Sequence, residues 1–307
     1  MEIIRNLGEM ARRHHPVVAI GNFDGVHQGH RAILREAIQC ARVAGGSAFA
    51  LTFDPLPASL LDPAHAPPLI MTPAEKLELL RLSGIDGVIV LDFTAEFSRI
   101  PPRDFVRDYL LGRIGARVVV VGHSVSFGHG RAGNAAAMVE FGREFGFDTI
   151  VVGPVKIDEM EVSSSKIRLL IQEGDLRRAA RLLGRYHFLS GRVVRGRERG
   201  RSLGFPTANL ESETQCIPAD GVYAGRVVLS DGVYPAIANI GLRPTFAEKQ
   251  RSIEAHLFDF DRDLYGERIK LELVERIRGE RRFDSPAALA AQIALDLSRA
   301  REILATA

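Results

Sequence analysis

Two histidines near the N-terminus, His27 and His30, have the type and spacing needed to act on a phosphate. They close the segment GNFDGVHQGH, where a β-rich run ends and helical spacing begins at about Gly29. Backbone N–H groups at a helix N-terminus attract anions, and Gly21 and Gly29 allow a phosphate chain to approach the backbone. Imidazoles placed there stabilise charge on a reacting phosphate. The structural alternative is that one histidine caps the helix while the other packs in the core.

A serine-rich segment, SSSKIR at residues 163–168, opens another helical pattern. The hydroxyls of Ser163 and Ser164 and the guanidinium of Arg168 are suited to holding nucleotide phosphates. Taken alone, the segment is equally typical of a serine N-cap followed by a surface arginine.

A third group of candidates lies in GRVVRGRERGRSLGFPTANL, residues 191–210. Its glycines let backbone N–H groups approach ATP phosphates, and a rigid proline follows them. Thr207 and Asn209 stand two apart on an extended segment, so their side-chain oxygens face one side and suit Mg²⁺. The alternative is a proline turn at a strand edge with a buried threonine. The backbone candidates are Gly196, Gly200, Gly204 and Pro206.

The segment RVVVVG leads into a loop at residues 122–134 that holds four glycines, two histidines and two serines. A loop of this composition has three possible interpretations: a phosphate-binding loop, a metal site or a flexible turn. His123 and His129 are six apart with no acid or cysteine nearby in the sequence, which argues against a transition-metal site. Glycines at the end of a central strand favour a nucleotide site.

The elements that must position these residues change character near residue 184. Up to about residue 182, β-rich runs alternate with helical patterns, which predicts a Rossmann-like α/β domain with a parallel sheet and ligands at the strands' carboxyl ends. The expected strands are 16–23, 47–53, 87–93, 117–122 and 148–153. The expected helices are 30–45, 72–84, 102–115 and 134–146.

The second half consists of β-rich runs separated by turns, which predicts a small antiparallel β-barrel. A terminal helix over 286–304 is expected after an N-cap at Asp284 or Ser285. We therefore expect domains at 1–184 and 185–307, with the boundary within 183–187. The expected barrel strands are 187–196, 221–230, 233–241, 252–260 and 268–278.

Composition limits the class of protein. The 307 residues are 46% apolar, enough for two globular domains, and a formal charge of +2 gives no global attraction to nucleic acid or membrane. The arginines of 192–201 lack the interleaved aromatics of a base-stacking surface. Two distant cysteines and no apolar run of signal or membrane length favour a cytoplasmic protein. Oligomeric state leaves no signal in the sequence.

The first half resembles the nucleotidylyltransferase superfamily, whose H-x-G-H motif is present as HQGH at 27–30 and whose second signature is present as SSSKIR. More narrowly, GNFDGVHQGH, TFDPLP at 52–57 and the glycine loop resemble the adenylyltransferase half of bacterial bifunctional riboflavin kinase/FAD synthetase. The resemblance implies transfer of AMP from Mg-ATP to FMN, with release of pyrophosphate. It implies contacts to ATP from Gly21, Phe23, His27, Gly29, His30, Ser163, Ser164 and Arg168. It places Phe53, Pro55, Pro57, Ser124 and Ser126 on the flavin side.

The second half resembles the riboflavin kinase signature, Gly-Phe-Pro-Thr-Ala-Asn, at 204–209. This implies phosphorylation of riboflavin by Mg-ATP, with the metal on Thr207 and Asn209. A kinase that acts on an alcohol needs a base for the hydroxyl, and the matching family glutamate is Glu254. By pattern alone, Glu254 is equally a solvated glutamate on a strand. The resemblance covers nearly the whole chain, in the order of the bifunctional enzyme.

The chain departs from the family in the glycine loop. The family usually reads G-x-D-F-x-F-G there, with arginine common at the second x, whereas this chain has Ser124 and Ser126. Our hypothesis is that the ATP site is retained while FMN adenylylation is weakened or redirected, whether by natural drift or by engineering. One alternative is a monofunctional riboflavin kinase whose first domain binds nucleotide without reacting. Another is a flavin- or nucleotide-sensing protein, against which the intact Thr207, Asn209 and Glu254 argue.

Overall fold

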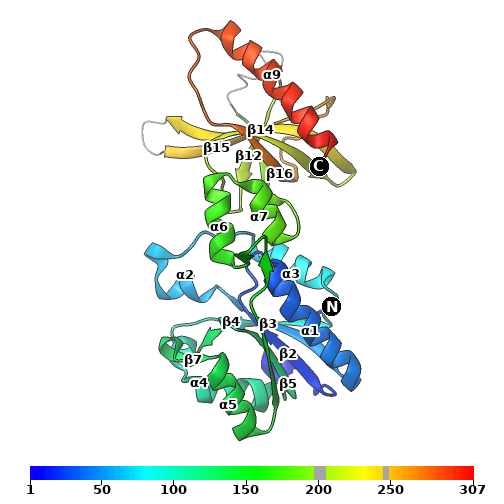
Figure 1. Ribbon diagram of the computed structural model, residues 1–307, viewed down its shortest axis with the longest axis vertical. Helices are drawn as coiled ribbons and strands as arrows, with labels where there is room; N and C mark the ends of the chain where they lie inside the picture. Colours follow the sequence, from blue (N-terminus) through cyan, green and yellow to red (C-terminus); the bar gives the residue numbers. More distant parts are fainter. Residues whose placement is uncertain (197–204, 245–248) are drawn as a thin grey trace. The chain divides into compact units, whose positions relative to one another are not determined.

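The computed structural model in Figure 1 describes residues 1–196, 205–244 and 249–307. The chain forms two compact units, one of residues 1–68 and 72–163 and the other of 69–71 and 164–307. The first contains a six-stranded sheet with helices, and the second contains a closed six-stranded barrel and a terminal helix. Both halves of the predicted fold class are therefore confirmed.

The sheet of the first unit is parallel throughout, with strand order β1-β4-β3-β2-β5-β8. Helices on both faces explain why every residue of β2 is buried. The edge strand β1 was not predicted, because a three-residue strand is too short to show a period. The strands are β1 (Glu2–Ile4), β2 (Pro16–Ile20), β3 (Ser47–Asp54), β4 (Gly87–Asp92), β5 (Val118–Gly122) and β8 (Asp148–Val152).

The helices of this unit begin at recognisable caps. Thr72 and Glu75 form a complete capping box at the start of α3, and Asn134 caps α5 through its side chain. The predicted helix 102–115 is a short α-helix that continues as a π-helix. The helices are α1 (Gln28–Ala44), α2 (Pro57–Leu61), α3 (Pro73–Leu82), α4 (Pro102–Asp104), the π-helix η4 (Phe105–Arg113) and α5 (Ala135–Phe145).

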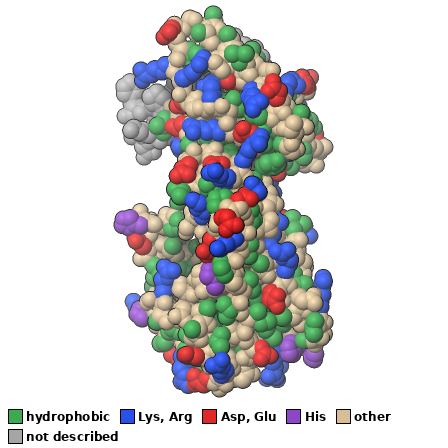
Figure 2. Space-filling model, in the orientation of Figure 1, with side chains coloured by type: hydrophobic (Ala, Val, Ile, Leu, Met, Phe, Trp, Pro, Cys, Tyr) green, Lys and Arg blue, Asp and Glu red, His purple; other side chains and the backbone are tan. Residues whose placement is uncertain are grey.

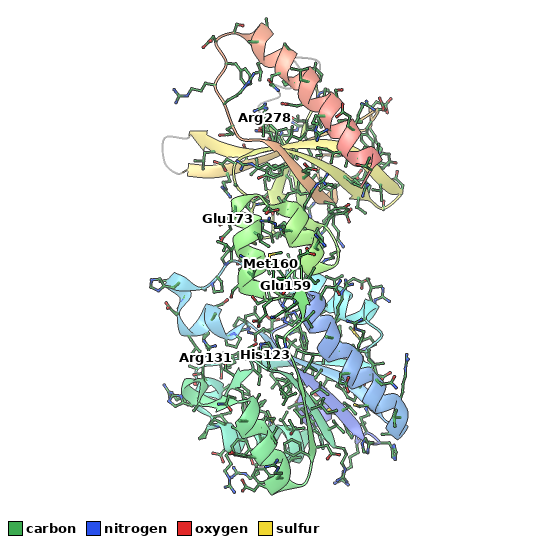
Figure 3. All side chains as sticks on the ribbon, viewed as in Figure 1. His123, Arg131, Glu159, Met160, Glu173 and Arg278 are labelled. Atoms are coloured by element: carbon green, nitrogen blue, oxygen red, sulfur yellow. The ribbon has the colours of Figure 1, made fainter. Side chains whose placement is uncertain are left out.

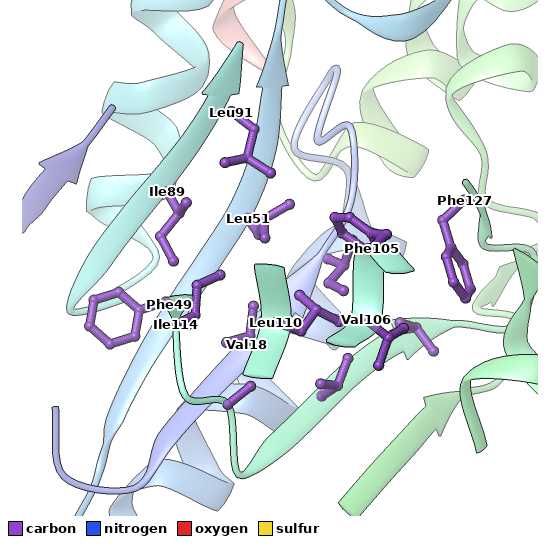
Figure 4. Packing of buried hydrophobic residues seen from close by; sticks show 14 of the residues in the cluster. Val18, Phe49, Leu51, Ile89, Leu91, Phe105, Val106, Leu110, Ile114 and Phe127 are labelled. Carbon is purple, nitrogen blue, oxygen red and sulfur yellow. The ribbon is translucent and has the colours of Figure 1, made fainter. Parts of the chain in front are cut away.

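One face of the sheet packs against the π-helix, as Figure 4 shows. Leu51 and Ile89 from neighbouring strands lie in one apolar cluster with Phe105, Val106 and Leu110. All five residues are at most 2% exposed, so the cluster fixes neighbouring strands against the π-helix.

The barrel of the second unit closes in the order β11-β12-β15-β14-β13-β16. All five predicted strands are present, and β12 is an addition that the sequence analysis described only as an extended segment. Ser285 caps the terminal helix by accepting a hydrogen bond from the Ala288 N–H. The strands are β11 (His187–Val194), β12 (Ala208–Ser212), β13 (Gly221–Leu229), β14 (Gly232–Pro244), β15 (Lys249–Leu257) and β16 (Arg268–Arg278). The helices are α6 (Ser164–Glu173), α7 (Leu176–Leu183) and α9 (Pro286–Ala305).

On the face drawn in Figure 2, Lys and Arg side chains are interspersed with Asp and Glu, in keeping with a formal charge of +2. Within the described ranges, none of the helices has the length and apolarity that a membrane span requires.

Candidate active sites

The loop between β2 and α1 places both histidines at the carboxyl end of the central strand. His27 is the N-cap of α1, and its Nδ1 accepts a hydrogen bond from the His30 N–H at 3.2 Å. The two rings stack with centroids 3.6 Å apart. The structural alternative is thus realised in part, since His27 caps the helix and is 5% exposed. In the neutral ring, an accepting Nδ1 leaves the proton on Nε2, where it can be donated to a phosphate oxygen.

Glycine at position 29 leaves the His27 ring and the backbone of Val162 close to the first turn of α1. A Cβ there would lie 3.1 Å from Cε1 of His27 and 3.4 Å from the carbonyl oxygen of Val162. Val162 directly precedes Ser163, so the start of the serine motif lies against the first turn of α1. Ser164 and Arg168 belong to α6 in the second unit, and their convergence on the histidines stays a prediction.

Two other expected ATP contacts have structural roles. Phe23 is fully buried with φ of 52°. Its ring packs edge-on against the imidazole of His30, with ring centroids 5.2 Å apart, so it helps to fix the orientation of that imidazole. The Gly21 N–H donates to the Leu51 carbonyl at 3.1 Å and is used by the sheet. A phosphate contact at these two positions would have to involve other backbone atoms.

A buried lysine that the sequence analysis missed connects the neighbouring segments. Lys76 Nζ on α3 donates to Thr52 Oγ1 and to the Phe53 carbonyl, each at 3.2 Å, and Thr52 in turn donates to the Asn22 carbonyl at 3.1 Å. Burial lowers the pKa of Lys76 to about 8, although the carboxylate of Asp54 opposes the shift. In the sequence, a lysine within EKLEL is typical of a solvent-exposed helix face.

The residues expected on the flavin side follow β3. Phe53 packs edge-on against Phe93 at 5.7 Å and lies at the margin of the apolar cluster. The Asp54–Pro55 peptide is cis, and Pro57 is the first residue of α2. Phe53, Pro55 and Pro57 therefore directly follow Thr52, the residue whose hydroxyl accepts a hydrogen bond from Lys76.

The glycine loop is a short hairpin rather than a flexible turn. It leaves β5, which lies beside β2 with Ile20 opposite Val121, and Ser126 then pairs with Asn134. Ser124 and Ser126 are exposed, and Arg131 Nε donates to Ser126 Oγ at 3.0 Å. Although serine replaces the arginine that is common in the family, the guanidinium of Arg131, from further along the chain, therefore lies against position 126.

The fold also brings an acid to this loop that sequence proximity did not suggest. His123 Nε2 lies 2.9 Å from Glu161 Oε1 in the hairpin of β9 (Lys156–Ile157) and β10 (Met160–Glu161). Figure 3 labels His123 and Arg131 in this unit. No group of three His, Cys, Asp or Glu side chains suited to a metal occurs in the described part of the chain.

The kinase candidates meet in the barrel. Asn209 on β12 pairs with Glu254 on β15, and Thr207 Oγ1 lies 3.4 Å from Glu254 Oε2. A Cβ on Gly196 would overlap the Asn209 amide, so glycine allows the backbone to approach the metal candidates. Side-chain oxygens of this kind fit Mg²⁺, which keeps several waters and phosphate oxygens as further ligands. Pro206 is exposed, whereas Gly200 and Gly204 lie outside the described residues.

A cavity of about 830 Å³ opens next to these residues. Thr207, Glu254 and His256 line one side, and residues of α9 with those at the end of β16 line the other. Arg278 and Asp296 anchor α9 through a nearly buried ion pair with nitrogen–oxygen distances of 2.8 to 3.1 Å. Figure 3 labels Arg278 beside the helix. Neither His256 nor this pair was predicted, because their partners are distant in sequence.

Comparisons with known proteins give a family for each half of the chain. Residues 9–166 match the FAD synthetase family and residues 183–304 match the riboflavin kinase family. The chain is 37% identical to the bifunctional riboflavin kinase/FMN adenylyltransferase of Escherichia coli (strain K12), over 98% of this chain and 97% of that protein. The Bacillus subtilis (strain 168) protein of the same name is 35% identical over 92% and 91%.

A solved structure matches the whole chain in fold. It is the crystal structure described as a macrolide-efflux protein from Streptococcus pneumoniae, with a TM-score of 0.89 and 32% identity. The match covers 97% of this chain and 98% of that one.

Proposed function

The chain belongs to the bifunctional riboflavin kinase/FMN adenylyltransferase family, and on that premise we propose that its halves catalyse two successive steps of flavin cofactor synthesis. The barrel half phosphorylates riboflavin with ATP to give FMN. The α/β half transfers AMP from a second ATP to FMN, giving FAD and pyrophosphate. The observation that carries the kinase assignment is the grouping of Thr207, Asn209 and Glu254 beside an 830 Å³ cavity.

In the kinase reaction, Glu254 accepts the proton of the terminal ribityl hydroxyl as that oxygen bonds to the γ-phosphorus of ATP. The bond between the γ-phosphorus and its bridging oxygen breaks, and ADP leaves. Thr207 and Asn209 would hold Mg²⁺, which neutralises charge on the ATP phosphates when it is bound. The apolar wall of α9 excludes water from the hydroxyl and thereby limits ATP hydrolysis.

In the transferase reaction, a phosphate oxygen of FMN bonds to the α-phosphorus of ATP, and the bond to the β-phosphate bridging oxygen breaks. His27 and His30 are placed to donate hydrogen bonds to phosphate oxygens that gain charge. We assign Ser163, Ser164 and Arg168 to the nucleotide phosphates, and Phe53, Pro55 and Pro57 to the flavin. Arg168 also offsets the charge of the leaving pyrophosphate.

A second reading is supported by Ser124 and Ser126, which lack the acid and the arginine usual in the family. In that reading, the α/β half binds ATP while FMN adenylylation is slow or acts on another acceptor, and the chain functions mainly as a riboflavin kinase. Arg131 beside Ser126 favours the bifunctional reading, because it supplies a cation at that place. We propose the cytoplasm as the compartment, since Cys40 and Cys216 are both free thiols.

The direct test is to incubate the protein with riboflavin, and separately with FMN, in Mg-ATP and to resolve the flavins by chromatography. We expect FMN from riboflavin and FAD from FMN. FMN without FAD would support the monofunctional reading, whereas no phosphorylation of riboflavin would refute the kinase assignment. FAD formation as fast as the kinase step would refute the hypothesis of a weakened transferase.

A further inference from the structure

We propose that His256 is a positioning residue of the kinase site. Its hydrogen bond to the Pro206 carbonyl holds Thr207 beside Glu254, and through this bond it sets the geometry of phosphoryl transfer. The proposal rests on the kinase function proposed above.

The strand β15 places His256 on the same face as Glu254. Ile253, Ala255 and Leu257 are at most 6% exposed and point into the barrel, so the alternating residues face the cavity. The barrel register runs from Asn209 opposite Glu254 to Ala208 opposite Ala255. Continued by one residue, this register brings Thr207 alongside His256.

The hydrogen bond fixes which ring nitrogen carries a proton. His256 Nδ1 lies 2.8 Å from the Pro206 carbonyl oxygen, and a carbonyl only accepts, so Nδ1 is the donor. Proline has no N–H, and this carbonyl is therefore the polar backbone group through which the residue before Thr207 can be held. The ring is further confined by Phe205, whose ring stands edge-on at 5.9 Å, and by Phe258 at 6.1 Å.

Loss of this bond would affect catalysis more than flavin binding. Thr207 Oγ1 and Glu254 Oε2 are 3.4 Å apart. In the proposed reaction Thr207 serves the ATP phosphates through Mg²⁺ and Glu254 serves the ribityl hydroxyl, so their separation must match the distance between the reacting groups. A displacement of about 1 Å of a reacting group costs on the order of 100-fold in rate. We therefore expect the main effect of a His256 variant in the kcat of FMN formation, together with a higher Mg²⁺ requirement and little change in the riboflavin KM.

Two amide substitutions separate this role from other functions of the imidazole. In His256→Asn the amide nitrogen occupies a position similar to Nδ1 and can still donate to Pro206. In His256→Gln the nitrogen lies near the position of Nε2, and in His256→Ala there is no donor. The kcat of FMN formation should fall about 10- to 100-fold in the Ala and Gln variants, while the Asn variant retains most of it. FAD formation from FMN, measured on the same preparations, reports on the other unit and should not change.

Several results would overturn the proposal. Full activity in His256→Ala would show that the bond is dispensable, and an Asn variant as slow as Ala would assign the effect to Nε2. A parallel fall in FAD formation would show that the substitution acts beyond the kinase site, which would refute a positioning role confined to that site. Imidazole NMR of the unsubstituted protein should show Nδ1 protonated, and a proton only on Nε2 would contradict the assignment. If the unsubstituted protein made no FMN, the proposed function itself would fail, while the NMR result would still test the hydrogen bond.

Discussion

At the scale of single residues, Lys76 is buried where the sequence is typical of an exposed helix face. The residue is 6% exposed, and its ammonium group joins α3 to the end of β3 and, through Thr52, to the loop before α1. Burial of a charge costs stability, and the pKa of about 8 records that cost. A lysine kept there against this cost is typical of a functional position.

Lys76→Met should therefore separate stability from activity. A shift of the pKa from 10.5 to about 8 corresponds to about 3 kcal/mol at neutral pH, so removal of the charge offsets the lost hydrogen bonds. We expect unchanged or higher stability in urea at pH 7 and at least about a 10-fold fall in FAD formation. Between pH 8 and 10.5 the unfolded lysine binds more protons than the folded one, so this group makes the protein more stable as pH rises.

The comparison protein for this pH effect is Lys76→Met itself, which lacks the titrating group. The difference in urea unfolding free energy between the two proteins should become more favourable to the lysine protein as pH rises from 8. A variant less stable by more than about 1 kcal/mol at pH 7 would mean that Lys76 serves the fold instead. FMN formation should stay constant in either case.

In the glycine loop, Arg131 and Ser126 should act as one unit. Arg131→Gln removes a guanidinium beside the expected acceptor, and loss of a charge-assisted contact costs about 1.5 to 3 kcal/mol, or roughly 10- to 100-fold. We expect this loss in the kcat/KM for FMN, with the kinase rate unchanged. Adding Ser126→Arg to the same protein should restore most of the activity.

The control for this loop is the pair Ser124→Asp and Ser126→Arg with Arg131 retained. If these positions contact the acceptor, the two changes should couple in FAD formation rather than add. Rates equal to the unsubstituted protein in all of these variants would show that the hairpin does not contact FMN.

At the scale of elements, strand β11 contains another buried ionisable group with a shifted pKa. His187 Nε2 donates to the Cys216 carbonyl at 2.9 Å, and burial lowers the pKa of His187 to about 4. The side chain is 2% exposed and lies where β11 meets the segment before β13. The contact between β11 and the segment before β13 is therefore stable only while the imidazole of His187 is neutral.

Acid should weaken the barrel through this residue. Between pH 6.5 and 4 the unfolded histidine binds a proton that the folded one does not. The free energy of unfolding therefore falls by about 3 kcal/mol as the pH is lowered from 6.5 to 4. His187→Gln keeps a donor near Nε2 without titrating in this range. The free energy of unfolding of this variant in urea should therefore fall less between pH 6.5 and 4. Hydrogen exchange of β11 peptides should show the same smaller loss of protection. Equal pH dependence in the two proteins would exclude His187 as the cause.

The expected elements could be read from the sequence because their periods are local properties. Alternating βα patterns indicated the parallel sheet, and their absence after residue 184 indicated the barrel. β1 was missed because three residues are too few to show a period, and β12 was described only as an extended segment, although it pairs with β11 and β15. The π-helix was also missed, since a change of hydrogen-bond register leaves the apolar spacing nearly unaltered.

At the scale of the whole molecule, the position of the boundary can be tested. The sequence places it near 184, whereas α6 and α7 belong to the second compact unit. Ala179 and Leu182 of α7 are fully buried where the helix packs on β11 and β16, and Arg177 forms an ion pair with Glu275. The barrel therefore gains part of its apolar covering from residues before 184.

A fragment of residues 164–307 should be more stable than one of 185–307. Burial of two or three apolar side chains contributes about 1.5 to 3 kcal/mol each, so the shorter fragment should unfold at lower temperature. Thermal unfolding by circular dichroism and FMN formation would measure the difference. Equal melting temperatures would favour the boundary at 184.

The sequence by itself determined the two fold classes and the chemical groups, because apolar period and motif spacing are properties of neighbouring residues. Tertiary structure alone decided that Lys76 is buried, that Arg131 lies against Ser126 and that His256 holds Pro206. Each of these contacts joins residues on different elements or turns. Their energies come from burial and hydrogen-bond geometry, which exist only once the strands and helices have packed.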